Sequence, residues 1–189
     1  MSELAITYRG TVYPWQCDHM GHMNVMWYVG KFDEASWQLL ATLGFTRTRT
    51  REEGAGMVAV EQHISYKREL LAGDIVTVRS NIVDVKDKAL HLFHEMRNDE
   101  TGEIVATMTV VGIHIDMHAR KAQSLPEDIR SRAVVATNRQ VDPDLAFSQR
   151  TSESNVYFDV SSPCADSPIG ESAHGPNSQV TDLLFNPVR

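Results

Sequence analysis

Between residues 24 and 43, apolar side chains recur at steps of three and four positions, with polar side chains between them. The apolar positions are Val25, Val29, Phe32, Leu39, Leu40 and Leu43, and the polar ones include Lys31, Glu34 and Gln38. This period predicts one long amphipathic helix. Asn24 is a residue type favoured at a helix N-cap, and Gly44 stands where a glycine commonly ends a helix. The next stretch, "TRTRTREEGAG" at 46–56, is polar and is expected to be a loop.

Five segments rich in β-branched and aromatic residues predict strands. They are residues 4–16, 57–67, 75–85, 89–98 and 104–118. Pro14 marks an edge or a bend near the end of the first segment. The last four follow one another across short turns that contain Gly or Asp, which favours an antiparallel meander. In 57–67, alternation places Val58, Val60, Ile64 and Tyr66 on one face and Glu61, His63, Ser65 and Lys67 on the other.

The segment "LPEDIRSRAVV" at 125–135 predicts a short last helix, because a proline and two acids suit the first turn. One amphipathic helix buried against a five-stranded antiparallel sheet is an α+β fold, which we assign to a domain over residues 1–138. Residues 139–189 are dominated by Ser, Asp, Asn, Pro and Gly. They are expected to form a polar C-terminal tail, extended or poorly packed, and not a second domain.

Composition and targeting signals narrow the classes of function. A chain of 189 residues, 42% hydrophobic and 23% charged, is sufficient for one buried core. No run approaches the roughly 18 apolar residues of a membrane span, and the first ten residues lack a secretory signal. Cys17 and Cys164 lack CxxC spacing, so no disulfide framework is expected. We therefore expect a cytoplasmic protein with no membrane partner.

The formal net charge of −7 argues against nucleic acid as a partner, because phosphate backbones are bound by clustered Lys and Arg. Short basic clusters occur at 47–51, 66–68 and 119–121. Two interpretations of these clusters remain open. They are solvated loop residues, or they are a local site for the phosphates of a small anionic ligand.

Candidate chemistry is concentrated in "WQCDHMGHMN" at 15–24. Asp18, His19 and His22 are metal-ligand types, and His114, Asp116 and His118 alternate along a predicted strand. Neither set has a metalloenzyme pattern such as HExxH, so no metal is expected. A thiol nucleophile at Cys17 is also disfavoured, because the adjacent Asp18 carboxylate opposes formation of a thiolate.

A third interpretation concerns the junction between the first strand and the helix. The first N–H groups of a helix are unpaired and carry partial positive charge. A carbonyl group placed there would have its oxygen bound by these donors, while the Asp18 carboxylate acts on its carbon or on an attacking water. Gly21 would allow the loop to turn and a ligand to approach the backbone. The alternative is that Asp18 and Asn24 only cap the helix.

The motif "CDHMGHMN" followed by "VMWYVGKFDEA" resembles the signature of the 4-hydroxybenzoyl-CoA thioesterase-like branch of the hotdog fold. That signature is an Asp, a Gly-His-x-Asn group, and a helix with a Tyr and an acid-Ala pair. The resemblance extends over about residues 5–135, since the predicted order of elements matches too. It implies a sheet wrapped around the long helix, activity as an acyl-CoA thioesterase, no cofactor, and a homodimer or homotetramer. Gln16 stands where the family often has a further acid.

The resemblance also implies roles for individual residues. Asp18 would be the catalytic base or nucleophile, and the N–H of Val25 would bind the oxyanion. His22 and Asn24 would shape the loop and position substrate or water. The predicted substrate-binding residues are Gly21 and Tyr28 from the same motif, Glu61 and His63 for the acyl pocket, and Lys67 and Arg68 from the basic cluster.

The predicted reaction is hydrolysis of a small-to-medium acyl-CoA thioester to a carboxylic acid and CoA. Three alternatives stay open: a non-catalytic acyl-CoA-binding hotdog protein, a thioesterase that acts on acyl carrier protein, and an α+β interaction module without a ligand. Asp18 in the expected loop favours an enzyme, and an interaction module would leave the residues around Asp18 unexplained beyond helix capping.

Overall fold

The computed structural model describes residues 4–138. Its elements, in chain order, are β1 (Ala5–Thr11), the 3₁₀ helix η1 (Pro14–Gln16), α1 (Val25–Leu43), α2 (Arg47–Glu53), β2 (Ala55–Tyr66), β3 (Ile75–Val85), β4 (Ala89–Asn98), β5 (Ile104–Asp116), β6 (Lys121–Ala122) and α3 (Glu127–Asn138). The tail predicted for 139–189 lies outside the described residues.

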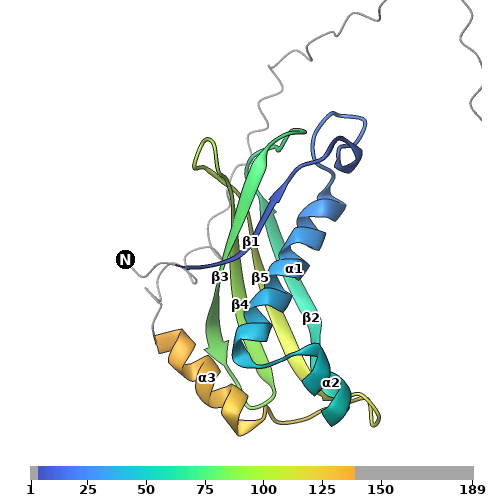
Figure 1. Cartoon of the computed structure of the whole chain (residues 1–189), viewed down its shortest axis with the longest axis vertical. Coiled ribbons are helices and arrows are strands. Elements are labelled where there is room, and N and C mark those ends of the chain that lie inside the picture. Colours follow the sequence, from blue (N-terminus) through green and yellow to red (C-terminus); the bar gives the residue numbers. More distant parts are fainter. Residues whose placement is uncertain (1–3, 139–189) are drawn as a thin grey trace, which may run out of the picture. The chain divides into compact units, whose positions relative to one another are not determined.

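All the strands pair antiparallel, in the order β1-β3-β4-β5-β2, with the two-residue β6 added beside β5. Helix α1 lies across one face of this curved sheet (Figure 1). Helix α3, the last element within residues 4–138, packs against β3. The prediction of an α+β hotdog fold, one long helix against five long antiparallel strands, is confirmed. The predicted meander of the last four strands is wrong for β2, which pairs with β5 and not with its neighbour in sequence, β3.

Helix α1 begins and ends where its sequence predicts. The Asn24 side chain accepts a hydrogen bond from the N–H of Met26 at 3.0 Å, and Gly44 adopts a left-handed φ of 103° at the other end. Its buried apolar side chains are Tyr28, Phe32, Ala35, Leu39, Leu40 and Leu43. A fully buried Leu or Phe contributes about 1.5–3 kcal/mol to folding, so this stripe is the main reason the helix forms.

Two positions of the helix differ from the prediction. Lys31, expected on the solvent face, is only 3% exposed, because β1 crosses that side of α1. Its Nζ donates to the hydroxyl of Tyr8 at 3.1 Å and to the carbonyl of Thr11 at 3.2 Å. Val25, expected on the apolar face, is 56% exposed, because it is the first residue of the helix and precedes the buried stripe.

Strand β2 does not keep the predicted alternation. A β-bulge between Ala59 and Glu61 inserts an extra residue and reverses which side chains face the helix. Ile64 lies opposite the buried Met108 and faces α1, as does Tyr66, whereas Val58 and Val60 are exposed. The prediction that these four share one face was therefore wrong.

The polar stretch at 46–56, predicted to be a loop, contains helix α2 and the start of β2. Thr46 caps α2 by accepting from the N–H of Arg49, and Gly54 ends it at φ 60°. Arg49 bonds Glu53 one turn later at 2.7 Å and binds Asp128 of α3 through two nitrogens. The contact with Asp128 is between residues distant in sequence, which is why local polarity did not indicate a helix.

Smaller corrections concern the ends of elements. The first strand stops at Thr11, because Pro14 begins η1, where the Gln16 side chain accepts from the N–H of Tyr13 at 3.0 Å. Strand β5 stops at Asp116, whose carboxylate accepts from the N–H groups of His118 and Ala119 at 2.8 Å and closes a turn. Helix α3 runs to residue 138 instead of 135.

Four polar residues form a buried cluster beneath α1: Thr7, Ser36, Ser80 and His94. Ser36 donates to the carbonyl of Phe32, so its Oγ must accept from Nε2 of His94 at 3.1 Å. The other ring nitrogen, Nδ1, then accepts from Ser80 at 2.6 Å. Burial lowers the pKa of His94 to about 3, so the ring is neutral and its hydrogen bonds are satisfied inside the core.

Candidate active site

The loop between η1 and α1 is a tight turn closed on itself. Cys17 and Met23 form an antiparallel bridge, and the N–H of Asp18 donates to the carbonyl of His22 at 3.0 Å. Gly21 completes the turn at φ 82°, a conformation that glycine adopts without strain. This short loop holds Asp18, His22 and Asn24 next to the first turn of α1.

The side chain of Asp18 is half-buried and held at both oxygens. Oδ1 accepts from the N–H of Met20 at 2.9 Å, and Oδ2 lies 3.5 Å from Nδ2 of Asn24. Asn24, not Asp18, caps α1. Asp18 therefore closes its own turn and keeps a carboxylate beside the helix start, so helix capping does not explain why an acid stands here.

The first N–H of the helix lies in the same region. The N–H of Met26 donates to the capping side chain of Asn24, and the N–H of Trp27 donates to the carbonyl of Asn24. The N–H of Val25 donates no hydrogen bond within residues 4–138. An unpaired donor at the positive end of a 19-residue helix is suited to binding a carbonyl oxygen on which negative charge develops.

His22 is directed to a residue that sequence reasoning did not identify. Its Nε2 lies 3.0 Å from a carboxylate oxygen of Glu69, in the turn after β2. Backbone contacts support this pair, since the N–H of Met23 donates to the carbonyl of Leu70 at 2.7 Å and His22 bridges Leu71. Glu69 is 47 positions from His22 and belongs to no motif, so only the fold could reveal it. We call Asp18, His22, Asn24 and Glu69 the loop cluster.

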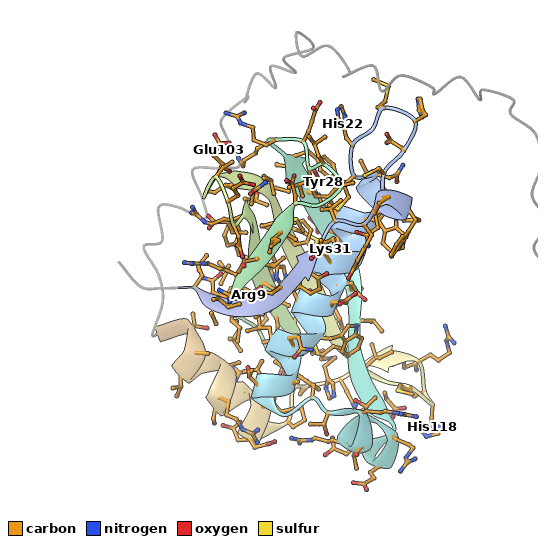
Figure 2. The ribbon with its side chains drawn as sticks, turned by 45° about the horizontal axis from the view of Figure 1, so that its top comes forward. Arg9, His22, Tyr28, Lys31, Glu103 and His118 are labelled. Carbon is orange, nitrogen blue, oxygen red and sulfur yellow. The ribbon has the colours of Figure 1, made fainter. Side chains whose placement is uncertain are left out.

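Tyr28 lies one turn into α1, and its side chain faces the core. It is 4% exposed, its hydroxyl donates to the carbonyl of Arg68 at 3.3 Å, and its ring packs edge-on against Tyr66 at 5.2 Å. Burial, with smaller effects from Tyr66, Glu69 and Asp74, raises the pKa of Tyr28. Tyr28 thus fastens the helix start to the segment after β2, and Figure 2 shows it beside His22 at one end of the molecule.

The predicted substrate-binding residues fall into two groups. Lys67 and Arg68 follow β2 and are exposed at the same end as the loop cluster, with Arg68 3.6 Å from Glu103. Glu61 and His63 lie opposite Val111 and Thr109 of β5, on the sheet face away from α1. A single chain therefore brings Asp18, Gly21, His22, Asn24, Val25 and Tyr28 together with Lys67 and Arg68, but not with Glu61 and His63.

The residues considered for a metal site and for a thiol nucleophile can also be located in the structure. Within residues 4–138, no group of three or more His, Cys, Asp or Glu side chains is placed to hold a metal ion. His114 is buried and its Nδ1 bonds the carbonyl of Ser124 at 2.9 Å, whereas His118 is exposed in the turn after β5. The Sγ of Cys17 lies 3.9 Å from the carbonyl of Tyr13, and no basic side chain in the described part of the chain bonds it.

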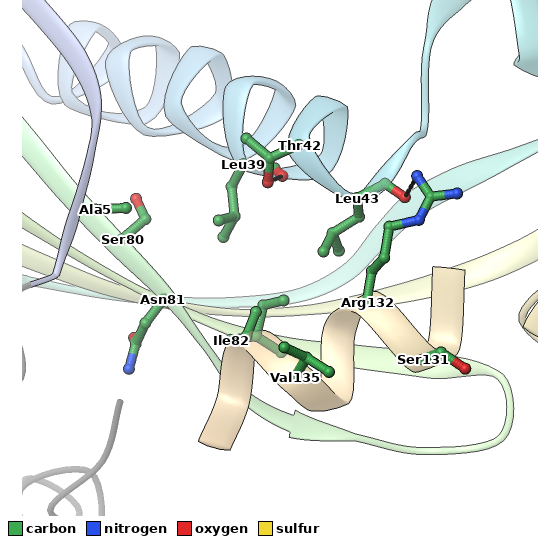
Figure 3. Close-up of a pocket in the computed structure, with 11 residues that line it drawn as sticks. Ala5, Leu39, Thr42, Leu43, Ser80, Asn81, Ile82, Ser131, Arg132 and Val135 are labelled. Atoms are coloured by element: carbon green, nitrogen blue, oxygen red, sulfur yellow. Dashed lines mark hydrogen bonds between the residues drawn. The ribbon is translucent and has the colours of Figure 1, made fainter. Parts of the chain in front are cut away.

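A cavity of about 450 Å³ lies at the opposite end of α1 (Figure 3). It is lined by Leu39 and Leu43 of α1, by Ser80 and Ile82 of β3, and by Arg132 and Val135 of α3, among others. Leu39 follows Val25 by 14 helical residues, which corresponds to roughly 20 Å along the axis. This cavity is therefore separate from the loop cluster, and a thioester bound at Asp18 would not occupy it.

The sequence profile of the Thioesterase-like superfamily matches residues 12–133, which include the loop cluster and every element from η1 to the first half of α3. The chain belongs to this superfamily. It is also 31% identical over 126 residues to L-carnitine dehydrogenase/betainyl-CoA thioesterase from Rhizobium sp, covering 66% of this chain and 25% of that protein.

Betainyl-CoA thioesterase from Pseudomonas aeruginosa is 24% identical over 132 residues, covering 70% of this chain and 83% of that protein. The solved structure of the hypothetical protein SAV2348 from Staphylococcus aureus in complex with CoA has the same fold, with a TM-score of 0.69 and 24% identity. That alignment covers 75% of this chain and 89% of the other. No helix within residues 4–138 is long and apolar enough to span a membrane.

Proposed function

We propose that this member of the superfamily is an acyl-CoA thioesterase that hydrolyses a small-to-medium acyl-CoA to a carboxylic acid and CoA. The observation that carries the proposal is the placement of the Asp18 carboxylate in a closed turn beside the unpaired N–H of Val25. Hydrolysis of a thioester needs a base or nucleophile on one side of the carbonyl and a donor for its oxygen on the other. These two groups supply both.

The reaction balances without any cofactor. Asp18 accepts a proton from water, whose oxygen bonds to the thioester carbon, and the N–H of Val25 stabilises the oxyanion. The carbon–sulfur bond then breaks, and the CoA sulfur leaves with its electron pair and takes up a proton. In a second route Asp18 attacks the carbon itself and the C–S bond breaks, so that CoA leaves as the thiolate; water then cleaves the resulting mixed anhydride, which returns the Asp18 carboxylate and supplies the proton that the thiolate takes up. His22, oriented by Glu69, and Asn24 would hold the loop in shape for either route.

The relatives named betainyl-CoA thioesterase point to an acyl group with a quaternary ammonium as one candidate substrate. The exposed aromatic pair of Tyr13 and Trp15, just before the loop, favours such a substrate. Trp15 stacks on Tyr13 with ring centroids 4.4 Å apart, is 69% exposed, and precedes Asp18 by three positions. Aromatic faces attract quaternary ammonium groups, so a cationic acyl chain would find a partner here.

We also propose that the active unit contains at least two copies of the chain, as a homodimer or homotetramer. Within residues 4–138, strand β2 pairs only with β5, so its other edge presents backbone groups without a partner in that range, and the exposed Val58 and Val60 lie along it. A second copy pairing there would cover this edge. Light scattering on the full chain at micromolar concentration should give at least twice the monomer mass; a monomer would contradict this part of the proposal.

Release of free thiol from a panel of acyl-CoAs tests the activity. The panel should contain acetyl, butyryl, octanoyl, benzoyl and betainyl thioesters of CoA, and the same acyl groups on acyl carrier protein. Turnover of at least one CoA thioester, well above the uncatalysed rate, is expected. Tight binding of CoA without turnover would favour the non-catalytic alternative, and turnover confined to acyl carrier protein would identify the other carrier.

A further inference from the structure

The edge of β2 that faces away from β5 has little to keep a second copy of the chain from pairing with it. The strand is 12 residues long, and residues 58–63 in its middle are all exposed. Edge strands that stay unpaired commonly carry a lysine or a proline, and the stretch "VAVEQH" has neither. Its one protective feature is the bulge after Ala59. The second copy required by the proposed homo-oligomer is therefore placed along this edge.

The polar side chains of this stretch favour one register for two antiparallel β2 strands. Identical strands that pair antiparallel are related by a two-fold axis, and the register is defined by the residue at the axis. With Glu61 or His63 at the axis, like side chains would lie directly opposite each other. With Val60 there, neither residue would gain a polar partner. With Gln62 there, Glu61 of each copy lies opposite the partner's His63, which can donate to a carboxylate in either charge state.

This register brings helix α2 of one copy to the loop cluster of the other. Counting outward from Gln62, residues 55–57 lie opposite residues 67–69 of the partner, to within the one position that the bulge adds. Glu69, which binds His22, is in that segment. In one chain, α2 lies beside the start of β2, at the end of the sheet opposite the loop between β1 and α1 (Figure 1). A two-fold axis between strands of one sheet is perpendicular to the sheet, so it exchanges these ends and keeps both helices α1 on the same face.

Helix α2 carries the basic cluster 47–51, for which two interpretations stayed open. Arg49 is used inside the chain, by its contacts with Glu53 and α3. Arg47 and Arg51 are exposed, and their side chains form no hydrogen bond or ion pair within residues 4–138. They are four positions apart, so they lie on the same side of the helix. The neighbouring acid Glu52 is one charge against these two, and the fold itself gives the pair no anion to bind.

Two such arginines suit the phosphates of the CoA nucleotide. A guanidinium group presents a planar fork of N–H donors that matches two oxygens of a phosphate. On the receiving copy, Lys67 is exposed at the same end as the loop cluster and forms no ion pair within residues 4–138. We propose that Arg47 and Arg51 of each copy complete the active site of the other copy by binding phosphates of the CoA nucleotide. The identity of the ligand rests on the proposed function, and its location rests on the pairing of two β2 edges.

Disulfide formation between copies tests the register without any ligand. In the full chain with Cys17→Ser and Cys164→Ser, the variant Gln62→Cys places two thiols at the axis. Facing residues of an antiparallel pair have Cα atoms about 4.5–5.5 Å apart, within the range of a disulfide. Val58→Cys is the matched control on the same exposed edge, because its two copies would be roughly 25 Å apart. After oxidation, Gln62→Cys should run as a covalent dimer on a non-reducing gel and Val58→Cys as a monomer.

Calorimetric titration of the full chain with CoA tests the arginines. The double variant Arg47→Gln with Arg51→Gln should bind CoA at least about tenfold more weakly than the wild type, the factor expected of one hydrogen bond to a charged group. The control is Arg9→Gln with Lys88→Gln, which removes two exposed cations from β1, at the other edge of the sheet, and from the turn between β3 and β4. It should bind CoA as the wild type does. Melting curves establish that each variant is folded.

Co-expression of Asp18→Asn with the double variant tests whether the arginines serve the other copy. In a mixed dimer, one site combines Asp18 of the double variant with Arg47 and Arg51 of the Asp18→Asn chain. That site should hydrolyse acyl-CoA with the KM of the wild type. If the arginines served their own copy, no site would hold all three residues, and the KM would stay that of the double variant.

Three results would overturn the proposal: a disulfide in Val58→Cys but not in Gln62→Cys, equal affinity for CoA in the wild type and the double variant, or no recovery of KM in the mixed dimer. These results are separable from the proposed function. Disulfide formation and titration need no turnover, so they decide the matter even if no thioester is hydrolysed. Conversely, wild-type affinity and KM in the double variant would remove this inference and leave the thioesterase activity intact.

Discussion

The loop cluster and the buried cluster are both groups of polar side chains beside α1. They differ in their exposure to solvent and in whether all their hydrogen-bonding groups have partners. In the buried cluster, both ring nitrogens of His94 are bonded to hydroxyl groups, and His94 is 0% exposed. In the loop cluster, Asp18 and His22 are half-buried, and the N–H of Val25 beside them has no partner within residues 4–138. A polar group that is sealed and fully bonded stabilises the fold, whereas one that keeps access and an unpaired neighbour is available for chemistry.

The largest effect on turnover is expected from a substitution at Asp18. Asp18→Asn keeps the size of the side chain and an oxygen for the N–H of Met20, but removes the negative charge. Turnover of the best acyl-CoA should fall by about two orders of magnitude or more, the usual contribution of a general base. Initial rates of thiol release at saturating substrate measure this. Glu34→Gln, on the exposed side of α1, is the control and should keep most of the activity.

The reverse behaviour is expected of His94. His94→Leu leaves the hydroxyls of Ser36 and Ser80 buried without their ring partner, so the free energy of unfolding should fall by on the order of 3 kcal/mol. Turnover per folded molecule should stay close to that of the wild type, because the ring does not reach the loop cluster. Urea unfolding measures the loss of stability, and turnover is measured at a temperature below the melting temperature of the variant. Loss of turnover in fully folded protein would contradict a purely structural role.

The buried cluster should also make stability depend on pH. The pKa of His94 is about 3 in the folded chain and near 6.5 when unfolded. Between these two pH values the folded state binds fewer protons than the unfolded state. The stabilisation that the neutral, bonded His94 contributes is therefore fully present above about pH 6.5. It is lost as pH falls toward 3, by up to about 1.4 kcal/mol per unit. Urea midpoints at pH 7, 5.5 and 4.5 should decline in the wild type and decline less steeply in His94→Leu; equal slopes would contradict the assignment.

Asn24 belongs to both the fold and the proposed site, and two substitutions separate these roles. Asn24→Ala removes the helix cap and should cost about 1 kcal/mol of stability. Asn24→Ser can still cap α1 but lacks the amide that approaches Asp18, so its stability should stay within about 0.5 kcal/mol of the wild type. Both should lose about tenfold in turnover, the value of one hydrogen bond to a charged group. Wild-type turnover in Asn24→Ser would show that the amide has no catalytic part.

The smallest effect is expected at Cys17. Its thiol lies next to Asp18 in the sequence, but its one hydrogen-bond contact among residues 4–138 is the carbonyl of Tyr13. Cys17→Ser should therefore keep most of the turnover and shift the melting temperature by a few degrees at most. Labelling the wild type with a thiol reagent would not be a substitute for this variant, because a bulky adduct in the loop would obstruct the carboxylate whatever the role of the sulfur.

Much of the fold could be predicted because local rules determine it. Asn24 and Gly44 mark the two ends of α1, and the strands predicted at 75–85 and 89–98 have those bounds in the structure. What could not be predicted depends on contacts distant in sequence. Lys31 is buried because β1 covers it, and α2 is tied to Asp128. The bulge in β2 follows from its pairing with β5, which periodicity does not encode.

The candidate site divides in the same way. The motif from Asp18 to Tyr28 is contiguous, so its residues could be placed together from sequence alone. Glu69 could not, because the turn that brings it to His22 depends on how β2 leaves the sheet. Glu61 and His63 were predicted to line the acyl pocket. In one chain they lie on the face away from α1, and whether a second copy brings them to a pocket stays a prediction.

The central claim is that the loop cluster carries catalysis and the buried cluster carries stability. The most direct test measures turnover and a melting curve for Asp18→Asn and His94→Leu side by side, at one temperature where both are folded. We expect the two variants to show opposite defects. Asp18→Asn should lose about two orders of magnitude in turnover with a melt near that of the wild type, and His94→Leu should melt much earlier with turnover retained. Wild-type turnover by folded Asp18→Asn would contradict the account.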